Sequence, residues 1–176
     1  MFGQRKDKKF EKLKNLAESG DAEAQFTIGS MYYSGEGVDM NIEEAVKWTR
    51  LSAENGDSWG QLFMGVAYAA GDGVEKDMEE SFRWLKMSAE QGNTSAQMSL
   101  GFAYYDGEFA EQDPAEGVKW FRMAAENGFP DGEFRLGIAY FEGKGVNRDP
   151  AEARKWIEKA SKKKHEGAKE HLKKYG

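Results

Sequence analysis

Apolar and polar residues alternate along this chain with the period of short amphipathic helices. Ala24, Ile28 and Tyr32 are spaced four residues apart and form one apolar stripe, which predicts a helix over residues 22–34. The glycine-rich segment 34–38 predicts a turn, because glycine adopts the positive φ angles that end a helix and redirect the chain. This part of the chain is therefore expected to be a helix followed by a tight turn.

A second amphipathic segment follows the turn. Ala45, Trp48 and Ser52 lie three and four residues apart and share a face, which predicts a helix over residues 42–54. Later copies of this helix are preceded by Asp-Pro dipeptides, which place Asp at the N-cap and Pro at the first helical position: Asp113-Pro114 and Asp149-Pro150. The basic pattern is thus a helix–turn–helix.

This pattern recurs every 36 residues. Shifting the chain by that number aligns glycine, tyrosine and tryptophan in four copies: Gly29, Gly65, Gly101 and Gly137; Tyr32, Tyr68, Tyr104 and Tyr140; Trp48, Trp84, Trp120 and Trp156. Four of the five tryptophans fall in this register, which chance does not explain. We therefore predict an all-α, right-handed α/α superhelical solenoid of helix-turn-helix repeats, which stack because one helix pair cannot bury both of its faces.

The register divides the chain into four complete repeats and two half repeats. We expect the following organisation: an N-terminal capping helix at 1–20, repeats at 21–56, 57–92, 93–128 and 129–164, and a C-terminal capping helix at 165–176. Lys12 stands where the register expects tryptophan, and Lys173 stands where it expects glycine. Charged residues at stacking positions suit terminal helices whose outer face meets water.

A glycine in the middle of each first helix predicts a close contact between helices. Glycine in a helix interior costs roughly 1 kcal/mol relative to alanine, so its recurrence at Gly29 and the equivalent positions needs a compensating gain. We expect neighbouring backbones to approach there too closely for a side chain. The large Tyr32 and Trp48 should fill the space beside the contact, and Trp84 and Trp120 should be buried between repeats.

Cysteine and apolar runs are both informative by their absence from the sequence. The chain has no cysteine, which excludes disulfides, thiol catalysis and cysteine-based zinc sites. It also has no apolar run long enough to span a bilayer and no apolar signal segment near its start. We expect a cytoplasmic protein, with a periplasmic or secreted one as the alternative if a signal peptide has been removed.

Charge is distributed unevenly along the chain. Residues 15–153 hold 26 Asp or Glu against 10 Lys or Arg, whereas residues 1–14 have a net charge of +4 and residues 154–176 a net charge of +6. The acidic body would repel phosphates, so we expect no nucleic acid partner. The basic ends are interpreted as solvated helix surface, or as contacts to an acidic partner or anionic surface around Lys162–Lys164.

The residues of one repeat carry a family resemblance. The pattern reads Ala24-Gln25-Phe26-x-Ile28-Gly29-x-Met31-Tyr32-x-x-Gly35-x-Gly37-Val38, followed by Ala45-x-x-Trp48-x-x-x-Ser52-Ala53-x-x-Gly56. It resembles the Sel1-like repeat, a longer relative of the tetratricopeptide repeat, and it covers nearly the whole chain. The resemblance implies a non-enzymatic module, acting as adaptor or regulator, that binds another protein or peptide segment. It also leaves open an immunity or inhibitor protein that neutralises a toxic enzyme.

One turn departs from the repeat pattern. In the third repeat, Phe109 and Ala110 replace the second turn glycine and the valine found at Gly73 and Val74. We expect this turn to follow a different path. Phe109 then either covers the neighbouring helix or presents an aromatic ring to a partner.

Comparison of the four repeats separates packing positions from variable ones. Four first-helix positions vary freely and fall on one face, which in stacked helix-pair solenoids lines the concave side. On this face we predict a partner-binding stripe whose apolar, aromatic and arginine composition is typical of binding hot spots: Trp59, Phe63, Val66, Phe102, Arg135 and Ile138. The alternative is that these side chains pack between first helices, and that Arg135 only pairs with Asp131.

A second aromatic row runs beside this stripe. Tyr33 and Tyr105 belong to it, and we include both as candidate binding residues. Their regular recurrence favours packing over binding, so both interpretations stay open.

Catalytic chemistry finds no suitable residues in the sequence. The histidines, His165 and His171, are six residues apart on different helix faces, and we expect both to be exposed to solvent. The resemblance also offers, as a third alternative, an enzyme acting on cell-wall-like or β-lactam substrates, but such an enzyme needs a nucleophile and base that the sequence does not provide. We expect no metal and no cofactor, and a monomer.

Overall fold

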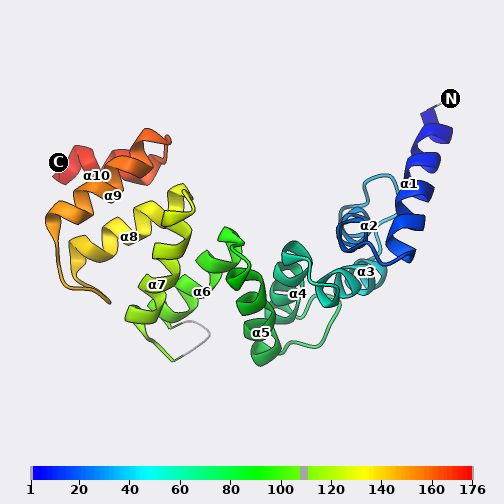
Figure 1. Ribbon diagram of the computed structural model, residues 1–176, viewed down its shortest axis with the longest axis horizontal. Coiled ribbons are helices and arrows are strands. Elements are labelled where there is room, and N and C mark those ends of the chain that lie inside the picture. The colour runs from blue at the N-terminus through cyan, green and yellow to red at the C-terminus, as the bar shows by residue number, and fades with distance from the viewer. Residues whose placement is uncertain (1, 108–110, 176) are drawn as a thin grey trace. The chain divides into compact units, whose positions relative to one another are not determined.

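The computed structural model describes residues 2–107 and 111–175, with side chains from Phe10 onward. This described part is all-α and contains ten helices (Figure 1). Their bounds are α1 Phe2–Glu18, α2 Ala22–Ser34, α3 Ile42–Glu54, α4 Ser58–Ala70, α5 Met78–Glu90, α6 Thr94–Asp106, α7 Pro114–Glu126, α8 Pro130–Glu142, α9 Pro150–Lys162 and α10 Glu166–Tyr175. The two helices expected in the first repeat, 22–34 and 42–54, are confirmed as α2 and α3.

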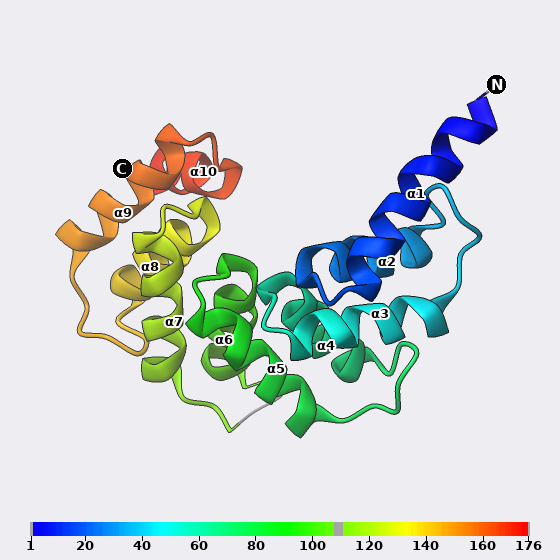
Figure 2. The same cartoon turned by 45° about the vertical axis from the view of Figure 1, so that its right-hand side comes forward.

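The helices form antiparallel pairs, and one turn joins the two helices of each pair. The pairs are α2 with α3, α4 with α5, α6 with α7 and α8 with α9, while α1 packs on α2 and α10 packs on α9 (Figures 1 and 2). The chain divides into two compact units, an N-terminal unit of residues 1–91 and a C-terminal unit of residues 92–176. Each unit holds two helix pairs and one single helix.

The glycine in each first helix lies directly against the second helix of the same pair. A Cβ atom on Gly29 would lie 3.0 Å from the Ala45 carbonyl oxygen and 3.1 Å from the Thr49 backbone nitrogen. On Gly137 it would lie 3.1 Å from the equivalent carbonyl oxygen, that of Ala153. The close backbone approach predicted from the recurring glycine is therefore confirmed.

Local side-chain and backbone bonds set the ends of these helices. Asp113 accepts hydrogen bonds from the backbone N–H groups of Ala115 and Glu116, and Asp149 caps α9 in the same way. At the other end of a first helix, Gly35 has a φ angle of 72° and donates its N–H to the Met31 carbonyl. The expected Asp-Pro starts and the glycine stop are thus confirmed.

Tryptophans fill the space between consecutive pairs. Trp84 is 4% exposed and packs with Val46 and Met64 of the preceding helices. Trp48 and Trp120 are also buried. This burial confirms that the tryptophan of one repeat completes the core of its neighbour.

Buried amides, which the sequence pattern did not single out, join α2 to α1 and α4 to α3. Gln25 donates to the Ala17 carbonyl at 2.9 Å, and Gln61 donates to the Ala53 carbonyl at 3.2 Å. The Gln25 side-chain oxygen in turn accepts a bond from Asn55, thirty residues later, at 2.9 Å. Buried polar groups need such partners, so these amides specify the register of stacking as well as stabilising it.

The last repeat replaces this amide pair with charges. Glu133 stands at the glutamine position and its side chain is fully buried. One of its carboxylate oxygens lies 2.8 Å from the ammonium nitrogen of Lys163 and 3.1 Å from that of Lys159. Lys163 also donates to the Gly128 carbonyl at 2.6 Å. The C-terminal unit therefore holds a buried carboxylate that depends on two lysines.

The atypical turn of the third repeat lies partly outside the described residues. Phe109 and Ala110 fall in that part, so the expected change of path stays a prediction. At the edge of the turn, the Gln112 side chain donates to the Tyr105 carbonyl at 3.1 Å.

The first testable prediction concerns the tryptophan between repeats. Trp84→Ala should lower the free energy of unfolding by roughly 3–5 kcal/mol, because it removes buried apolar area and leaves a cavity. Trp59→Ala is the matched control. This substitution should cost less than about 1 kcal/mol, because Trp59 is half-exposed. Denaturant unfolding measures both. Equal costs for the two variants would contradict the stacking role of Trp84.

A second prediction tests the buried carboxylate. Lys159→Ala combined with Lys163→Ala should cost about 3–5 kcal/mol of unfolding free energy, because Glu133 would stay buried without a cation. Adding Glu133→Gln restores the neutral side chain found at Gln61 and should recover most of that loss. If the triple variant is no more stable than the double variant, the loss does not come from the uncompensated charge.

Candidate protein-binding surface

Large apolar side chains are exposed on the first helices of the N-terminal unit. Trp59 is 52% exposed and Val66 is 54% exposed, and both project from α4 seven residues apart on one face. Tyr33, at the end of α2, is 43% exposed. These side chains lie on rigid helices, yet the packing of the unit does not use much of their area.

Tyr33 and Phe63 connect this face to the core. Their rings meet edge to face, with centroids 5.2 Å apart and an interplanar angle of 88°. Phe63 is partly buried and packs against the cluster that contains Met64. The Tyr33 hydroxyl donates to the Asp72 carboxylate at 3.2 Å, which holds the ring across the turn after α4. We call Tyr33, Trp59, Phe63 and Val66 the Trp59 surface.

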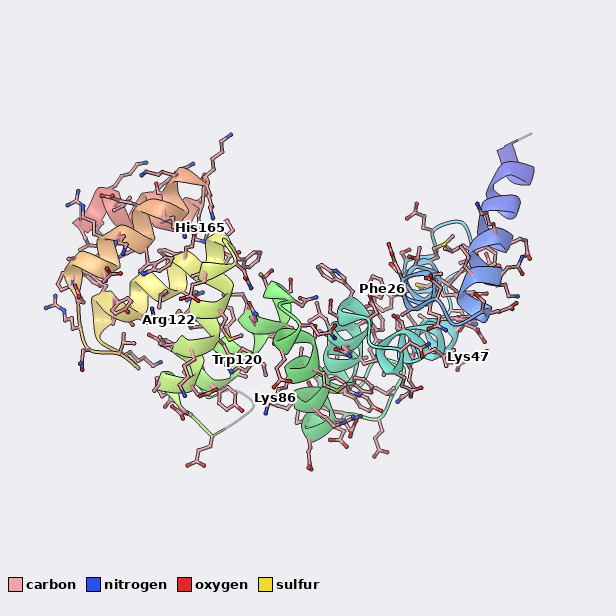
Figure 3. All side chains as sticks on the ribbon, in the orientation of Figure 1. Phe26, Lys47, Lys86, Trp120, Arg122 and His165 are labelled. Carbon is pink, nitrogen blue, oxygen red and sulfur yellow. The ribbon has the colours of Figure 1, made fainter. Side chains whose placement is uncertain are left out.

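The helices that carry the Trp59 surface have almost no charge. The sequence of α4 contains no Lys, Arg, Asp or Glu, and that of α2 contains only Glu23. The second helices of the same unit differ, since α3 and α5 carry lysines, arginines and glutamates; Lys47 and Lys86 are labelled on them in Figure 3. The Trp59 surface is therefore an apolar face with an acidic margin at Glu23 and Asp72.

The residues of the predicted stripe that lie in the C-terminal unit mostly pack against other residues of that unit. Phe102 packs edge to face on Phe121, with ring centroids 5.3 Å apart. The Arg135 guanidinium covers the Phe102 ring, 4.7 Å from its centroid. Asp131 pairs with His165, whose Nε2 atom lies 2.9 Å from the Asp131 carboxylate. Arg135 thus makes a cation–π contact within the unit, and its contact with a partner stays a prediction.

Tyr105 and Ile138 also serve packing. Tyr105 is buried, its hydroxyl lies 3.4 Å from the Glu142 carboxylate, and the Lys144 ammonium lies 4.0 Å from its ring centroid. Burial, followed by the nearby Glu142 charge, raises the pKa of Tyr105 from its ordinary value of 10.0 to about 12. Ile138 packs against the apolar cluster around Ile157. Of the predicted stripe, only the N-terminal members present extensive free apolar area.

The structure contradicts the expectation that both histidines are exposed to solvent. The ring of His165 is only 16% exposed; it accepts a bond from the Ala168 backbone N–H and so caps α10 (Figure 3). His171 has a buried Nε2 atom, and burial lowers the pKa of its imidazole. The sequence did hold a signal for His165, because the register places it at the N-cap position occupied by Asp21 and Asp57. For His171 no such signal exists, because its burial depends on how α10 packs.

No helix in residues 2–107 and 111–175 combines the length and apolar character needed to cross a membrane. This finding agrees with the apolar pattern of the sequence.

The family model of the Sel1 repeat matches residues 22–57, 60–93, 94–129 and 130–165. The chain belongs to the Sel1 repeat family. Sel1 repeats are protein-interaction scaffolds that generally bind other proteins, and the family is non-catalytic. The resemblance seen in the repeat pattern is therefore confirmed.

Solved structures show the same fold. The protective antigen c5321 of uropathogenic Escherichia coli, which displays an SLR fold, is 40% identical over 90% of this chain and 34% of its own, with a TM-score of 0.86. A Sel1 repeat protein from Oxalobacter formigenes is 35% identical over 95% of this chain and 48% of its own, with a TM-score of 0.89. The predicted class, an all-α solenoid of helix-turn-helix repeats, is confirmed by this similarity.

A more distant structure is also similar in fold. The immunity protein Pa5087 from Pseudomonas aeruginosa is 20% identical over 86% of this chain and 56% of its own, with a TM-score of 0.57. At that identity the likeness concerns the fold alone. This chain spans between about a third and just over half of the lengths of these three proteins.

The buried tyrosine gives a prediction about pH. Because the pKa of Tyr105 is raised, the folded protein holds the phenolic proton more tightly than the unfolded chain. The resulting stabilisation is complete below the ordinary pKa of 10.0 and is lost as the pH rises towards about 12. In an ultraviolet titration of tyrosinate, Tyr105→Phe should remove one of seven tyrosine amplitudes, the one near pH 12. An unchanged high-pH titration in this variant would contradict the assignment.

Proposed function

We propose that this protein is an adaptor or regulator that binds a partner protein through the Trp59 surface. The observation that carries the proposal is the exposure of Trp59 and Val66 on one face of α4, beside the exposed ring of Tyr33. Contiguous apolar side chains on a protein surface are typical of protein interaction sites. Tryptophan and tyrosine are also enriched among the residues that dominate binding energy.

The surface is prepared for binding before a partner arrives. Trp59 and Val66 stand on a helix whose glycine, Gly65, packs tightly against Leu85 of α5. Tyr33 is oriented by Phe63 on one side and by Asp72 on the other. Side chains that are ordered in advance lose less entropy on association, so more of the apolar burial contributes to affinity.

The charges around the surface favour a particular kind of partner. Glu23 and Asp72 border the apolar side chains, and neither α2 nor α4 carries a lysine or arginine. A segment with large apolar side chains flanked by lysine or arginine would therefore complement this surface. The contacts predicted at Phe102, Arg135 and Ile138 differ from those of the Trp59 surface. A partner would first have to displace the packing of these three side chains within the unit.

An immunity or inhibitor role is the second candidate function. Its support is limited to the fold shared with the immunity protein Pa5087. The same surface would serve both roles, and the identity of the partner separates them. A toxic enzyme as partner favours immunity, whereas a receptor or secretion component favours an adaptor.

Affinity capture from the native host tests the surface. We expect Trp59→Asp combined with Val66→Asp to lose a partner that the unchanged protein recovers, because both substitutions place charge in the apolar contact. Both side chains are more than half exposed, so the fold should be retained. Met87→Asp combined with Met123→Asp is the control, since these exposed side chains lie on the second helices α5 and α7. Thermal unfolding should be similar in all forms.

Recovery of the same partners by the unchanged protein and by the Trp59/Val66 variant would show that the Trp59 surface is not the binding site. Loss of the partner in the Met87/Met123 control would place binding on the second helices instead.

A further inference from the structure

A second site, distinct from the Trp59 surface, lies in the C-terminal unit. A cavity of about 190 Å³ opens between α8, α9 and α10. Apolar and aromatic side chains form its walls, together with one arginine: Phe141, Pro150, Arg154, Ile157, His171 and Tyr175. The repeat register makes it possible to ask what fills the equivalent space elsewhere in the chain.

In the N-terminal unit the equivalent space is filled by the turn of the next repeat. Ile42 and Val46 stand at the positions of Pro150 and Arg154. The turn glycine Gly73 is packed so tightly on them that an added Cβ would lie 2.8 Å from Ile42 Cγ2 and 2.7 Å from Val46 Cγ2. The valine that follows Gly73, Val74, joins the same apolar cluster as Val46.

The C-terminal unit repeats this arrangement one step before the cavity. Here Pro114 and Val118 occupy the two positions. The turn glycine Gly145 rests against the Pro114 backbone, 2.5 Å from its carbonyl carbon for an added Cβ, and Val146 packs against the cluster containing Val118. In both places the space is thus filled by a glycine followed by a valine. Among the described residues, no such turn covers Pro150 and Arg154.

The open cavity differs in charge from the two equivalent spaces that a turn fills. Arg154 stands where the other two spaces present a valine, and it is exposed at the rim, although it pairs with Glu158 at 2.8 Å. Residues 154–176 carry a net charge of +6. Of the two turns that fill the equivalent spaces, Gly71-Asp72-Gly73-Val74-Glu75 is acidic, whereas Gly143-Lys144-Gly145-Val146-Asn147 is basic. Both of those spaces present a valine, and a rim that presents an arginine instead complements the acidic segment.

The aromatic wall adds a polar contact. The rings of Phe141, His171 and Tyr175 pack against one another in edge-to-face and tilted contacts, with centroids 4.8 to 5.3 Å apart. The Nε2 atom of His171 is buried and has no hydrogen-bond partner among the described residues. A buried polar atom of this kind favours a ligand that supplies a hydrogen bond, such as a peptide backbone.

We propose that this cavity binds an acidic peptide segment of a partner protein, in which a glycine is followed by a valine and flanked by carboxylates. The valine occupies the apolar interior as Val74 and Val146 do within the chain. The carboxylates face Arg154 at the rim.

A synthetic peptide with the sequence of residues 70–77, Ala-Gly-Asp-Gly-Val-Glu-Lys-Asp, tests the proposal with the intact protein. We expect saturable NMR shift changes that include His171 and Leu172. The same peptide with valine replaced by serine should bind at least about tenfold more weakly, because the apolar side chain that fills the cavity is lost. A peptide with the sequence of residues 142–149, which keeps Gly-x-Gly-Val but has no net charge, should also bind more weakly.

Matched protein variants locate the binding. Arg154→Glu should weaken binding of the acidic peptide at least about tenfold, because it reverses the charge at the rim. Lys155→Glu makes the same change of charge on the neighbouring exposed residue, which does not line the cavity, and should have a smaller effect. Neither substitution touches a buried side chain, so thermal unfolding should report intact folding for both.

Three results would overturn the proposal. The first is the absence of saturation up to about 10 mM peptide, a concentration that would detect even weak binding. The second is equal weakening by Arg154→Glu and Lys155→Glu, which would indicate only a general attraction to the basic end. The third is concentration-dependent self-association of the unchanged protein that Arg154→Glu abolishes, because this would identify a second copy of the chain as the occupant. None of these outcomes bears on the Trp59 surface.

Discussion

The structure depends on one close contact, the approach of each first helix to its second helix at a glycine. At Gly29 and Gly137 the facing backbone is so near that a methyl group would collide with it. This approach fixes the geometry of a pair and leaves two large rings, such as Tyr32 and Trp48, beside the contact. Because those rings cannot be buried within one pair, a neighbouring helix must cover them, as α1 covers Tyr32 and Trp48. Stacking is therefore a consequence of the glycine.

Stacking in turn decides which side chains are available for function. The buried amides Gln25 and Gln61 hold α2 on α1 and α4 on α3 in register. Once the register is set, the outward positions of the first helices contribute little to stability. The N-terminal unit leaves them free at Trp59 and Val66, whereas the C-terminal unit uses the equivalent Phe102 beneath a guanidinium. The same fold thus presents exposed apolar side chains in one unit and packed ones in the other.

The last repeat departs from the others at several linked positions. Glu133 replaces a glutamine, Lys163 replaces an asparagine or glutamine, and Arg154 replaces a valine or phenylalanine. The first two exchange a neutral hydrogen bond for a buried ion pair, and the third brings charge to the rim of a cavity. The ion pair lies beside Gly128, at the junction with the preceding pair, whereas Arg154 lies at the cavity. Arg154 therefore distinguishes this cavity from the equivalent spaces that a turn fills.

The sequence by itself determined the helices, their bounds, the repeat register and the family, because these follow from periodic local signals such as Gly29, Trp48 and the Asp-Pro starts. It also singled out Trp59 as a tryptophan that packing does not require. Only the tertiary structure decided which variable residues are exposed. Burial of Tyr105 and His171 depends on contacts between residues more than thirty positions apart or on the packing of α10, and no local pattern encodes those contacts.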